Sequence, residues 1–217
     1  MQRRFLEIAD KTWYKEFFRT LFLTGMRPGE IAGLQWNDID WANGYLNIER
    51  SLDTVYEAGK RIHKYGPVKT INSYRRLPFM GDLEMILKEQ QHKQNELKKE
   101  MGTRYRCKDD FSNIVFTTSL GSVMGKDMAG KQCRIINEEM NLIEKATAEK
   151  EGREPVLMKT ITPYMIRHTF ATRCFESGMD TKVVQQLMGH AHYSTTMDIY
   201  VHVMGDKLKA EVEKFSL

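Results

Sequence analysis

Residues 162–203 of the chain read TPYMIRHTFATRCFESGMDTKVVQQLMGHAHYSTTMDIYVHV. Thr162 followed by Pro163 is typical of a helix start, where a capping hydroxyl precedes proline at the first helical position. Glycines at the ends of the periodic runs are typical of helix ends. The stretch predicts successive helices at 163–177, ending at Gly178, at 181–189, capped by Thr181 and ending at Gly189, and around Tyr200, capped by Ser194 or Thr195.

The rest of the chain predicts further helices and a small group of strands. Trp13, Phe17 and Leu21 recur every four residues, which is typical of an amphipathic helix. Residues 45–50 alternate in polarity, as a half-buried strand does. The predicted helices are 11–24, 30–36, 82–100, 127–150 and 206–214, and the predicted strands lie at 45–50, within 60–70 and at 75–78. The expected fold class is mostly α with a small antiparallel β-sheet (α+β).

Composition excludes several classes of protein. The 217 residues are 41% hydrophobic and 29% charged, which is ordinary for a globular domain and excludes a disordered or fibrous chain. The formal net charge of +4 permits a nucleic-acid partner without requiring one. Cys107, Cys133 and Cys174 are too far apart in sequence for a disulfide framework or a thiolate zinc site. No run reaches the roughly 18 apolar residues of a membrane span, so we expect a cytoplasmic protein with no membrane partner.

Basic residues are concentrated in the segment 60–80, which contains no acidic residue. A hairpin with this charge is a candidate for contact with DNA phosphates. The alternative is a solvated sheet edge on which charge prevents pairing with other strands, and the sequence leaves both interpretations open. The basic residues of the segment are Lys60, Arg61, Lys64, Lys69, Arg75 and Arg76.

Histidines gather near the C-terminus, at His168, His190, His192 and His202. A metal site needs further ligands, and neither a carboxylate nor a cysteine stands at ligand-like spacing from His190 and His192. We therefore predict no metal. His190 after Gly189 also has a simpler interpretation, as a residue favoured by the negative end of the preceding helix.

Three separate boxes of the sequence fit a different interpretation. They are TGMRPGEIAGLQWNDID (24–40), VKTINSYRRLPF (68–79) and the stretch quoted first, and they contain Arg27, Lys69, Arg167, His190 and Tyr200. In content, order and spacing, the boxes resemble the tyrosine recombinase (phage integrase) family over nearly the whole chain. The resemblance implies the fold of the family's catalytic domain, which breaks and rejoins DNA.

The resemblance also implies a role for each of these residues. Tyr200 would be the nucleophile that attacks a DNA phosphodiester and forms a 3′-phosphotyrosine. Arg27 and Arg167 would hold the non-bridging oxygens, which suit guanidinium forks. Lys69 would protonate the departing 5′-oxygen, and His190 would donate a hydrogen bond to the phosphate. The phosphotyrosine retains the energy of the broken bond, so neither a cofactor nor ATP is implied.

Residues beside these positions complete the predicted site. Glu30 resembles the family's acidic residue, whose implied role is structural support. His168 follows Arg167 as in the family and is also expected to support the site, buried beneath Tyr164. Tyr164 stands where the family usually has His or Lys. A phenol, with a pKa of about 10, is a poor base at neutral pH, so we expect Tyr164 to act by hydrogen bonding.

Other interpretations of these residues remain. Tyr200 has apolar neighbours, Ile199 and Val203, which also suit a core aromatic residue, and Tyr193 is a second candidate nucleophile. The family context selects Tyr200. A type IB topoisomerase shares this chemistry, and a non-catalytic DNA-binding protein would share the basic surface.

The resemblance implies partners and further domains. The whole of 1–217 is expected to be a single catalytic domain, without the N-terminal core-binding and arm-binding domains of the family. The implied partners are double-stranded DNA with attachment sites and other recombinase subunits. A tetramer on DNA would form through the C-terminal segment, in which Leu208, Val212 and Phe215 share one side of the predicted helix. Without DNA, a monomer is expected.

Overall fold

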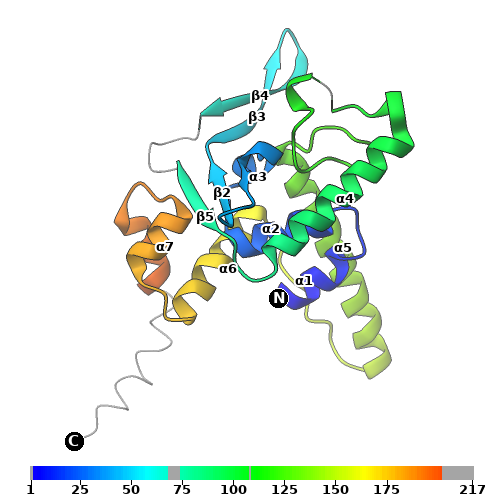
Figure 1. Cartoon of the computed structure of the whole chain (residues 1–217). Helices are drawn as coiled ribbons and strands as arrows, with labels where there is room; N and C mark the ends of the chain where they lie inside the picture. The colour runs from blue at the N-terminus through cyan, green and yellow to red at the C-terminus, as the bar shows by residue number, and fades with distance from the viewer. Residues whose placement is uncertain (1, 68–73, 108, 202–217) are drawn as a thin grey trace, which may run out of the picture.

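The computed structural model describes residues 2–67, 74–107 and 109–201. Within this part of the chain, helices pack beside two small antiparallel sheets, and the β3–β4 hairpin projects at the top of the view (Figure 1); this confirms the predicted mostly helical class. None of the helices described is long and apolar enough to cross a membrane. The helices are α1 (Gln2–Ala9), α2 (Lys15–Thr24), α3 (Pro28–Ala32), α4 (Leu83–Met101), α5 (Lys126–Glu151), α6 (Pro163–Glu176) and α7 (Thr181–Met188), followed by a helical segment at 193–201.

The strands fall into two sheets, whereas the sequence predicted one sheet of three strands. They are β1 (Ile39–Asp40), β2 (Tyr45–Ile48), β3 (Arg50–Glu57), β4 (Lys60–Pro67) and β5 (Arg75–Pro78). β2 pairs with β1 and β5, while β3 pairs with β4. The β3–β4 hairpin turns at Ala58 and Gly59, which both have positive φ (49° and 76°), as a type I′ turn requires. Alanine gives no turn signal, so β3 cannot be predicted from the sequence. Because the strand at 60–67 pairs with β3 in this hairpin, it does not pair with β2.

Helix starts follow their capping residues. Thr162 caps α6 as predicted, since its hydroxyl accepts a hydrogen bond from the Met165 backbone N–H at 3.2 Å. Asp180, rather than Thr181, caps α7, because its carboxylate accepts from the Lys182 N–H at 2.8 Å. The segment that holds Tyr200 is already helical at residue 193, before its predicted caps. The helix predicted at 206–214 lies outside the described residues.

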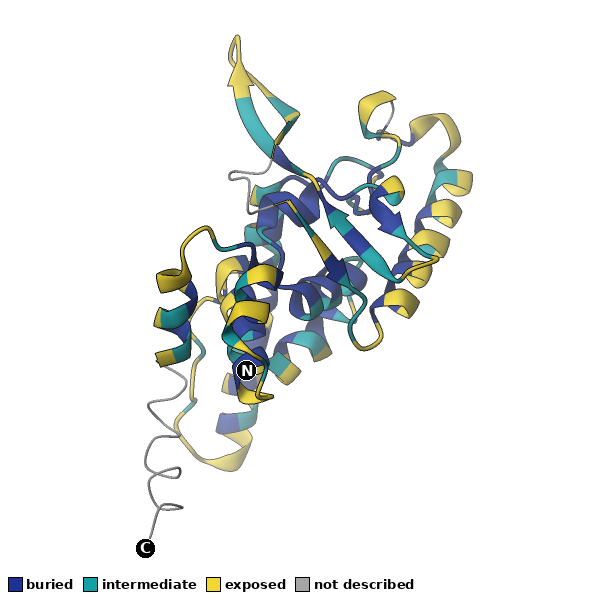
Figure 2. Cartoon of the chain, turned by 60° about the vertical axis from the view of Figure 1, so that its left-hand side comes forward, coloured by how far each residue is buried: buried dark blue, intermediate teal, exposed yellow. Residues whose placement is uncertain are grey.

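The core forms around α2, and Figure 2 shows the buried residues gathered in the interior of the molecule. Phe17, Phe18, Leu21 and Phe22 of α2 are all buried. The Phe5 ring of α1 meets the Phe18 ring edge-on, with 5.0 Å between the ring centroids. Burial of each such side chain stabilises the fold by about 1.5–3 kcal/mol. This packing therefore fixes the position of the C-terminal end of α2 within the core.

Segments distant in sequence converge at this end of α2. Gly25 ends the helix with a φ of 58°, and a Cβ atom there would lie 2.3 Å from the Phe170 ring of α6. Only glycine permits so close an approach of the end of α2 to α6. α7 in turn packs against α6 and β5. The start of α3, β5, α6 and the end of α7 thus meet in one region of the fold.

Candidate active site

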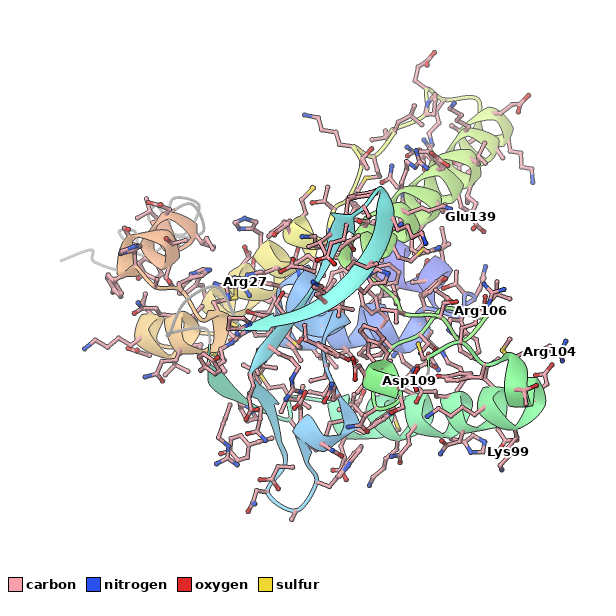
Figure 3. All side chains as sticks on the ribbon, turned by 90° about the horizontal axis from the view of Figure 1, so that it is seen from above. Arg27, Lys99, Arg104, Arg106, Asp109 and Glu139 are labelled. Atoms are coloured by element: carbon pink, nitrogen blue, oxygen red, sulfur yellow. The ribbon has the colours of Figure 1, made fainter. Side chains whose placement is uncertain are left out.

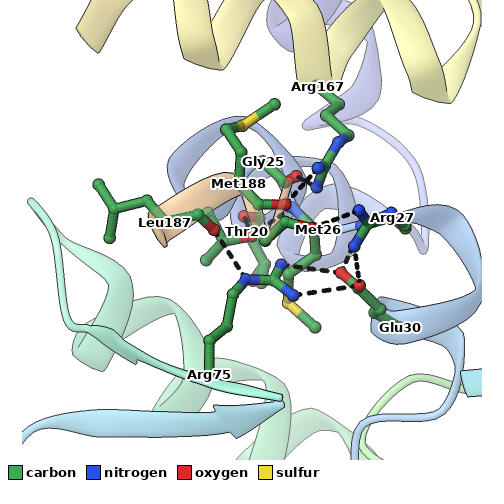
Figure 4. A network of polar contacts seen from close by, with 11 residues as sticks. Thr20, Gly25, Met26, Arg27, Glu30, Arg75, Arg167, Leu187 and Met188 are labelled. Atoms are coloured by element: carbon green, nitrogen blue, oxygen red, sulfur yellow. Dashed lines mark hydrogen bonds and ion pairs between the residues drawn. The ribbon is translucent and has the colours of Figure 1, made fainter. Parts of the chain in front are cut away.

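Three arginines from different elements converge on the C-terminal end of α7. Each donates a hydrogen bond to one of the successive carbonyl oxygens of residues 187–189 (Figure 4). Arg75 contacts the first at 2.7 Å, Arg167 the second, and Arg27 the third at 2.7 Å. The last carbonyls of a helix lack partners within it and carry the negative end of its dipole, so they suit guanidinium groups. We call these three arginines, with Glu30, the arginine corner.

Glu30 joins two of the arginines. Its carboxylate accepts hydrogen bonds from Arg27 Nη1 at 2.7 Å and from Arg75 Nη2 at 2.8 Å, and the residue is 3% exposed. Burial raises the pKa of Glu30, but the hydrogen bond and charge of Arg75 and the charge of Arg27 outweigh burial and lower the pKa to about 2. The carboxylate is therefore ionised at neutral pH and holds both guanidinium groups. This position suits the supporting role expected of Glu30.

Arg75 does not lie on the exposed, DNA-facing surface that the charge of 60–80 predicted. Its side chain is 6% exposed and is ion-paired with Glu30. The strand pattern explains the difference. Arg75 stands two residues before the buried Leu77 on β5, and alternate residues of a strand face the same side. The alternation of buried and exposed residues along the strand therefore predicts that Arg75 points inward, whereas the local net charge suggests an exposed position.

The other basic residues of that segment are divided between the two sheets. Those exposed on the β3–β4 hairpin are Lys60, Arg61 and Lys64. Arg61 reaches the carboxylate of Asp127, at the start of α5, at 3.1 Å. Arg76 lies on β5, and its guanidinium stacks 4.3 Å from the centre of the Tyr45 ring. DNA contact by these four basic residues stays a prediction.

Among the described residues, Arg167 is the most buried of the cations predicted to be catalytic. It is 5% exposed, and its Nη1 donates to the carbonyl oxygen of Gly25 at 2.5 Å. Burial, followed by the charge of Arg27, lowers the pKa of Arg167 to about 9. The guanidinium is thus still positive at neutral pH. Its orientation is fixed before any ligand arrives.

His190 stands directly after the end of α7, where Gly189 adopts a left-handed conformation with a φ of 60°. Its Nδ1 lies 2.9 Å from Thr196 Oγ1. Burial, and then the charges of Arg167 and Arg27, lower the pKa of His190 to about 4. The imidazole is therefore neutral at neutral pH. Across the described ranges, His, Cys, Asp and Glu form no group of three or more that could hold a metal ion.

The first turn of α6 presents Tyr164 to solvent. Tyr164 is 56% exposed and lines a cavity of about 380 Å³ together with Arg27 and Lys126. His168 is also exposed, so the expectation that it lies buried beneath Tyr164 is wrong. One residue beyond the buried Arg167, the helix has turned by about 100°, which carries His168 away from the core. This exposure removes the packing through which His168 was expected to support the site.

Tyr200 lies on the helical segment that follows His190. Its ring is half-buried and meets the Phe175 ring of α6 edge-on, with 5.2 Å between centroids. Among the described residues, no hydrogen bond joins Tyr200 to the arginine corner. Tyr193, the other candidate nucleophile, is exposed. Lys69 lies outside the described residues.

Two residues beside the corner were not predicted from the sequence. Lys126 begins α5, forms an ion pair with Asp53 of β3 at 2.8 Å, and lines the same cavity as Arg27. Thr196 is fully buried against His190. Of the two, only Thr196 could have been found from the sequence. It stands four residues before Tyr200, so the two side chains share one face of a helix.

Other exposed cations lie away from the arginine corner. In Figure 3, side chains from the end of α4 and the loop after it project on the opposite side of the view from Arg27; they are Lys99, Arg104 and Arg106. The three arginines at the end of α7 therefore form a cluster separate from these exposed cations.

Helices beside two small antiparallel sheets, with the arginine corner at the C-terminal end of α7, define the class of this domain. The chain belongs to the phage integrase family, which it matches over residues 3–206. This match confirms the resemblance seen in the sequence.

Known relatives agree with this membership. The chain is 35% identical to the tyrosine recombinase XerC-like protein of Caldanaerobacter subterraneus subsp. tengcongensis, over 92% of this chain and 48% of that protein. It is 46% identical to tyrosine recombinase XerA of Pyrococcus furiosus, over 99% of this chain and 59% of that protein. It is 29% identical to the transposase from transposon Tn916 of Enterococcus faecalis, over 96% of this chain and 47% of that protein. The chain thus spans about half the length of the curated relatives it matches.

Solved structures share the fold. The integrase of transposon Tn1549, in complex with transposon right-end DNA, matches with a TM-score of 0.75 at 23% identity, over 100% of this chain and 64% of that chain. The XerA recombinase matches with a TM-score of 0.66 at 20% identity, over 99% of this chain and 62% of that chain. At these identities the likeness shows the fold alone. It agrees with the fold implied by the resemblance.

Proposed function

We propose that this chain is the catalytic domain of a tyrosine-type site-specific DNA recombinase, or integrase, and acts on double-stranded DNA. The observation that carries the proposal is the arginine corner, which holds Arg27 and Arg167 beside a neutral His190. Family membership supports it, as do the names of relatives, which are tyrosine recombinases and a transposase. A structural neighbour in complex with DNA supports the substrate class.

The proposed reaction is cleavage of one DNA strand without a metal. The phenol oxygen of Tyr200 attacks the phosphorus, the bond to the 5′-oxygen breaks, and a 3′-phosphotyrosine forms. The phenol proton passes to water, and Lys69 supplies a proton to the departing 5′-oxygen. Attack by the 5′-hydroxyl of another strand then reverses the step, so that rejoining needs no ATP.

The arginine corner would lower the barrier by electrostatic stabilisation. Negative charge gathers on the non-bridging oxygens in the transition state, and fixed guanidinium groups stabilise it without reorganising. Arg27 lines the 380 Å³ cavity, which gives a phosphate access to it. The backbone carbonyl oxygens of Gly25 and Met188 accept hydrogen bonds from Arg167 and hold its guanidinium group in place. His190, being neutral, would contribute a hydrogen bond rather than a charge.

We further propose assembly on DNA. Subunits would form a tetramer through the segment 205–217, and the chain without DNA would be a monomer. The support is the family resemblance and the apolar pattern of Leu208, Val212 and Phe215. These residues lie outside the described part of the chain.

The function is tested with nicked duplex DNA taken from the sequence that flanks the gene, so that cleavage releases the leaving strand. The chain is expected to form a covalent adduct that survives detergent, without added metal, and to exchange strands between two such sites. Relaxation of supercoiled DNA without strand exchange would instead indicate a type IB topoisomerase. Binding without an adduct would indicate a non-catalytic DNA-binding protein.

A further inference from the structure

The helix that carries Tyr200 contacts His190 through one buried side chain. Thr196 is 0% exposed, and its Oγ1 lies 2.9 Å from His190 Nδ1. The two residues belong to different elements, since His190 follows α7 and Thr196 lies in the helical segment 193–201. The contact therefore ties the histidine to the helix of the proposed nucleophile.

The direction of this hydrogen bond follows from the hydroxyl proton. A buried hydroxyl that has one acceptor within reach gains most by donating its proton to that acceptor. Three other helical threonines donate to the carbonyl oxygen four residues earlier, at distances of 2.7–2.9 Å, whereas the buried Thr20 has no partner; the three are Thr24, Thr147 and Thr169. Over the described residues, Thr196 makes no such bond, and its hydroxyl has a single partner, His190 Nδ1. Thr196 is therefore the donor, and Nδ1 is the acceptor.

An accepting Nδ1 carries no proton. Burial and the charged or titratable groups that face His190, which are Arg167, Arg27, His168 and Arg75, lower the pKa of His190 to about 4. At neutral pH the ring is thus a neutral imidazole with one proton. If Nδ1 accepts, that proton is on Nε2.

We propose that Thr196 is a positioning residue that fixes His190 in the tautomer protonated on Nε2. The inference rests on the proposed function, in which His190 donates a hydrogen bond to the scissile phosphate. The Nε2–H tautomer offers that donor, whereas the opposite tautomer would present a lone pair to an anion. Because Thr196 and Tyr200 are four residues apart on one helix, the donor tautomer forms when that helix is seated beside the histidine.

The tautomer is measured directly by long-range ¹H–¹⁵N NMR of the histidine ring nitrogens in the DNA-free chain, with His190→Gln to assign the signals. Thr196→Ser keeps the hydroxyl, and Thr196→Val replaces it with a methyl group of similar size. Thr195→Val, at the exposed neighbouring position, is the matched control. Wild type, Thr196→Ser and Thr195→Val are expected to show protonated Nε2, and Thr196→Val a mixture of both tautomers.

Adduct formation on the nicked DNA gives the functional readout. Thr196→Val is expected to be about tenfold slower than wild type, the effect of losing one ordinary hydrogen bond, while the Ser and control variants stay close to wild type. A wild-type ring protonated on Nδ1, or a folded Thr196→Val with an unchanged tautomer, overturns the proposal. If Thr196→Val does not fold, the wild-type and Ser spectra decide. Because the tautomer is read without DNA, a wild type that forms no adduct refutes the proposed function separately.

Discussion

At the scale of single residues, Tyr164 is the position where this chain departs from its family. Its exposed phenol lines the cavity that reaches Arg27. A phenol orients neighbours by hydrogen bonding and is a poor acceptor of protons at neutral pH. Tyr164→Phe is therefore expected to slow adduct formation by about 1–1.5 kcal/mol of barrier, the value of one hydrogen bond. Tyr164→His restores the family pattern and is expected to match or exceed the wild-type rate.

Both variants are compared with wild type by measuring the rate of adduct formation across a range of pH. His190→Ala is the further comparison, and it is expected to lose more activity than either variant. Because Tyr164 is exposed, neither substitution is expected to disturb the fold, and a thermal melt checks this. If Tyr164→Phe lost as much activity as Tyr200→Phe, the phenol would be chemically essential, and its assignment as a positioning group would be wrong.

At the scale of elements, β5 is tied to α3 and α7 through Arg75. Removing this side chain leaves the buried Glu30 carboxylate with one guanidinium fewer and the Leu187 carbonyl without its donor. Breaking a buried ion pair from one side costs about 3–5 kcal/mol, so Arg75→Met is expected to lower the free energy of unfolding by that amount. Arg76→Met, on the same strand but exposed, is the matched control and should change it by about 1 kcal/mol or less. Urea unfolding followed by circular dichroism measures both, and equal small losses would show that Arg75 does not hold these elements together.

The elements also show what the sequence can and cannot predict. α6 and α7 were predictable because their caps and glycine ends are local signals, such as Thr162 before Pro163. The paired strands β2 and β5 were predictable too, but β3 and the division into two sheets were not, because the hairpin turns at Ala58, which carries no turn signal. In the site, Arg27, Arg167 and His190 were predictable from their boxes, and the structure brings them together at α7. Arg75 and His168 were misplaced because their exposure depends on strand alternation and helix phase, which charge and motif content do not reveal.

At the scale of the whole molecule, the C-terminal segment is expected to link subunits on DNA. Its apolar residues share one side of the predicted helix and suit packing against a second subunit. Ending the chain after Met204 is therefore expected to leave binding to a single DNA site within about threefold, since an intersubunit contact contributes little to one bound subunit. Strand exchange between two sites should fall at least about tenfold. Gel shift and strand-exchange assays on the same DNA separate the two, and unchanged exchange by the shortened chain would exclude this role.

The central claim is that Tyr200 becomes covalently joined to DNA. It is tested most directly by protease digestion and mass spectrometry of the adduct formed on nicked DNA. The account predicts a nucleotide attached to the peptide that contains Tyr200, and no adduct with Tyr200→Phe, a change that keeps the ring against Phe175 and should leave the melting temperature nearly unchanged. Tyr193→Phe should still form the adduct. A nucleotide on Tyr193, or an adduct that persists in Tyr200→Phe, would contradict the account.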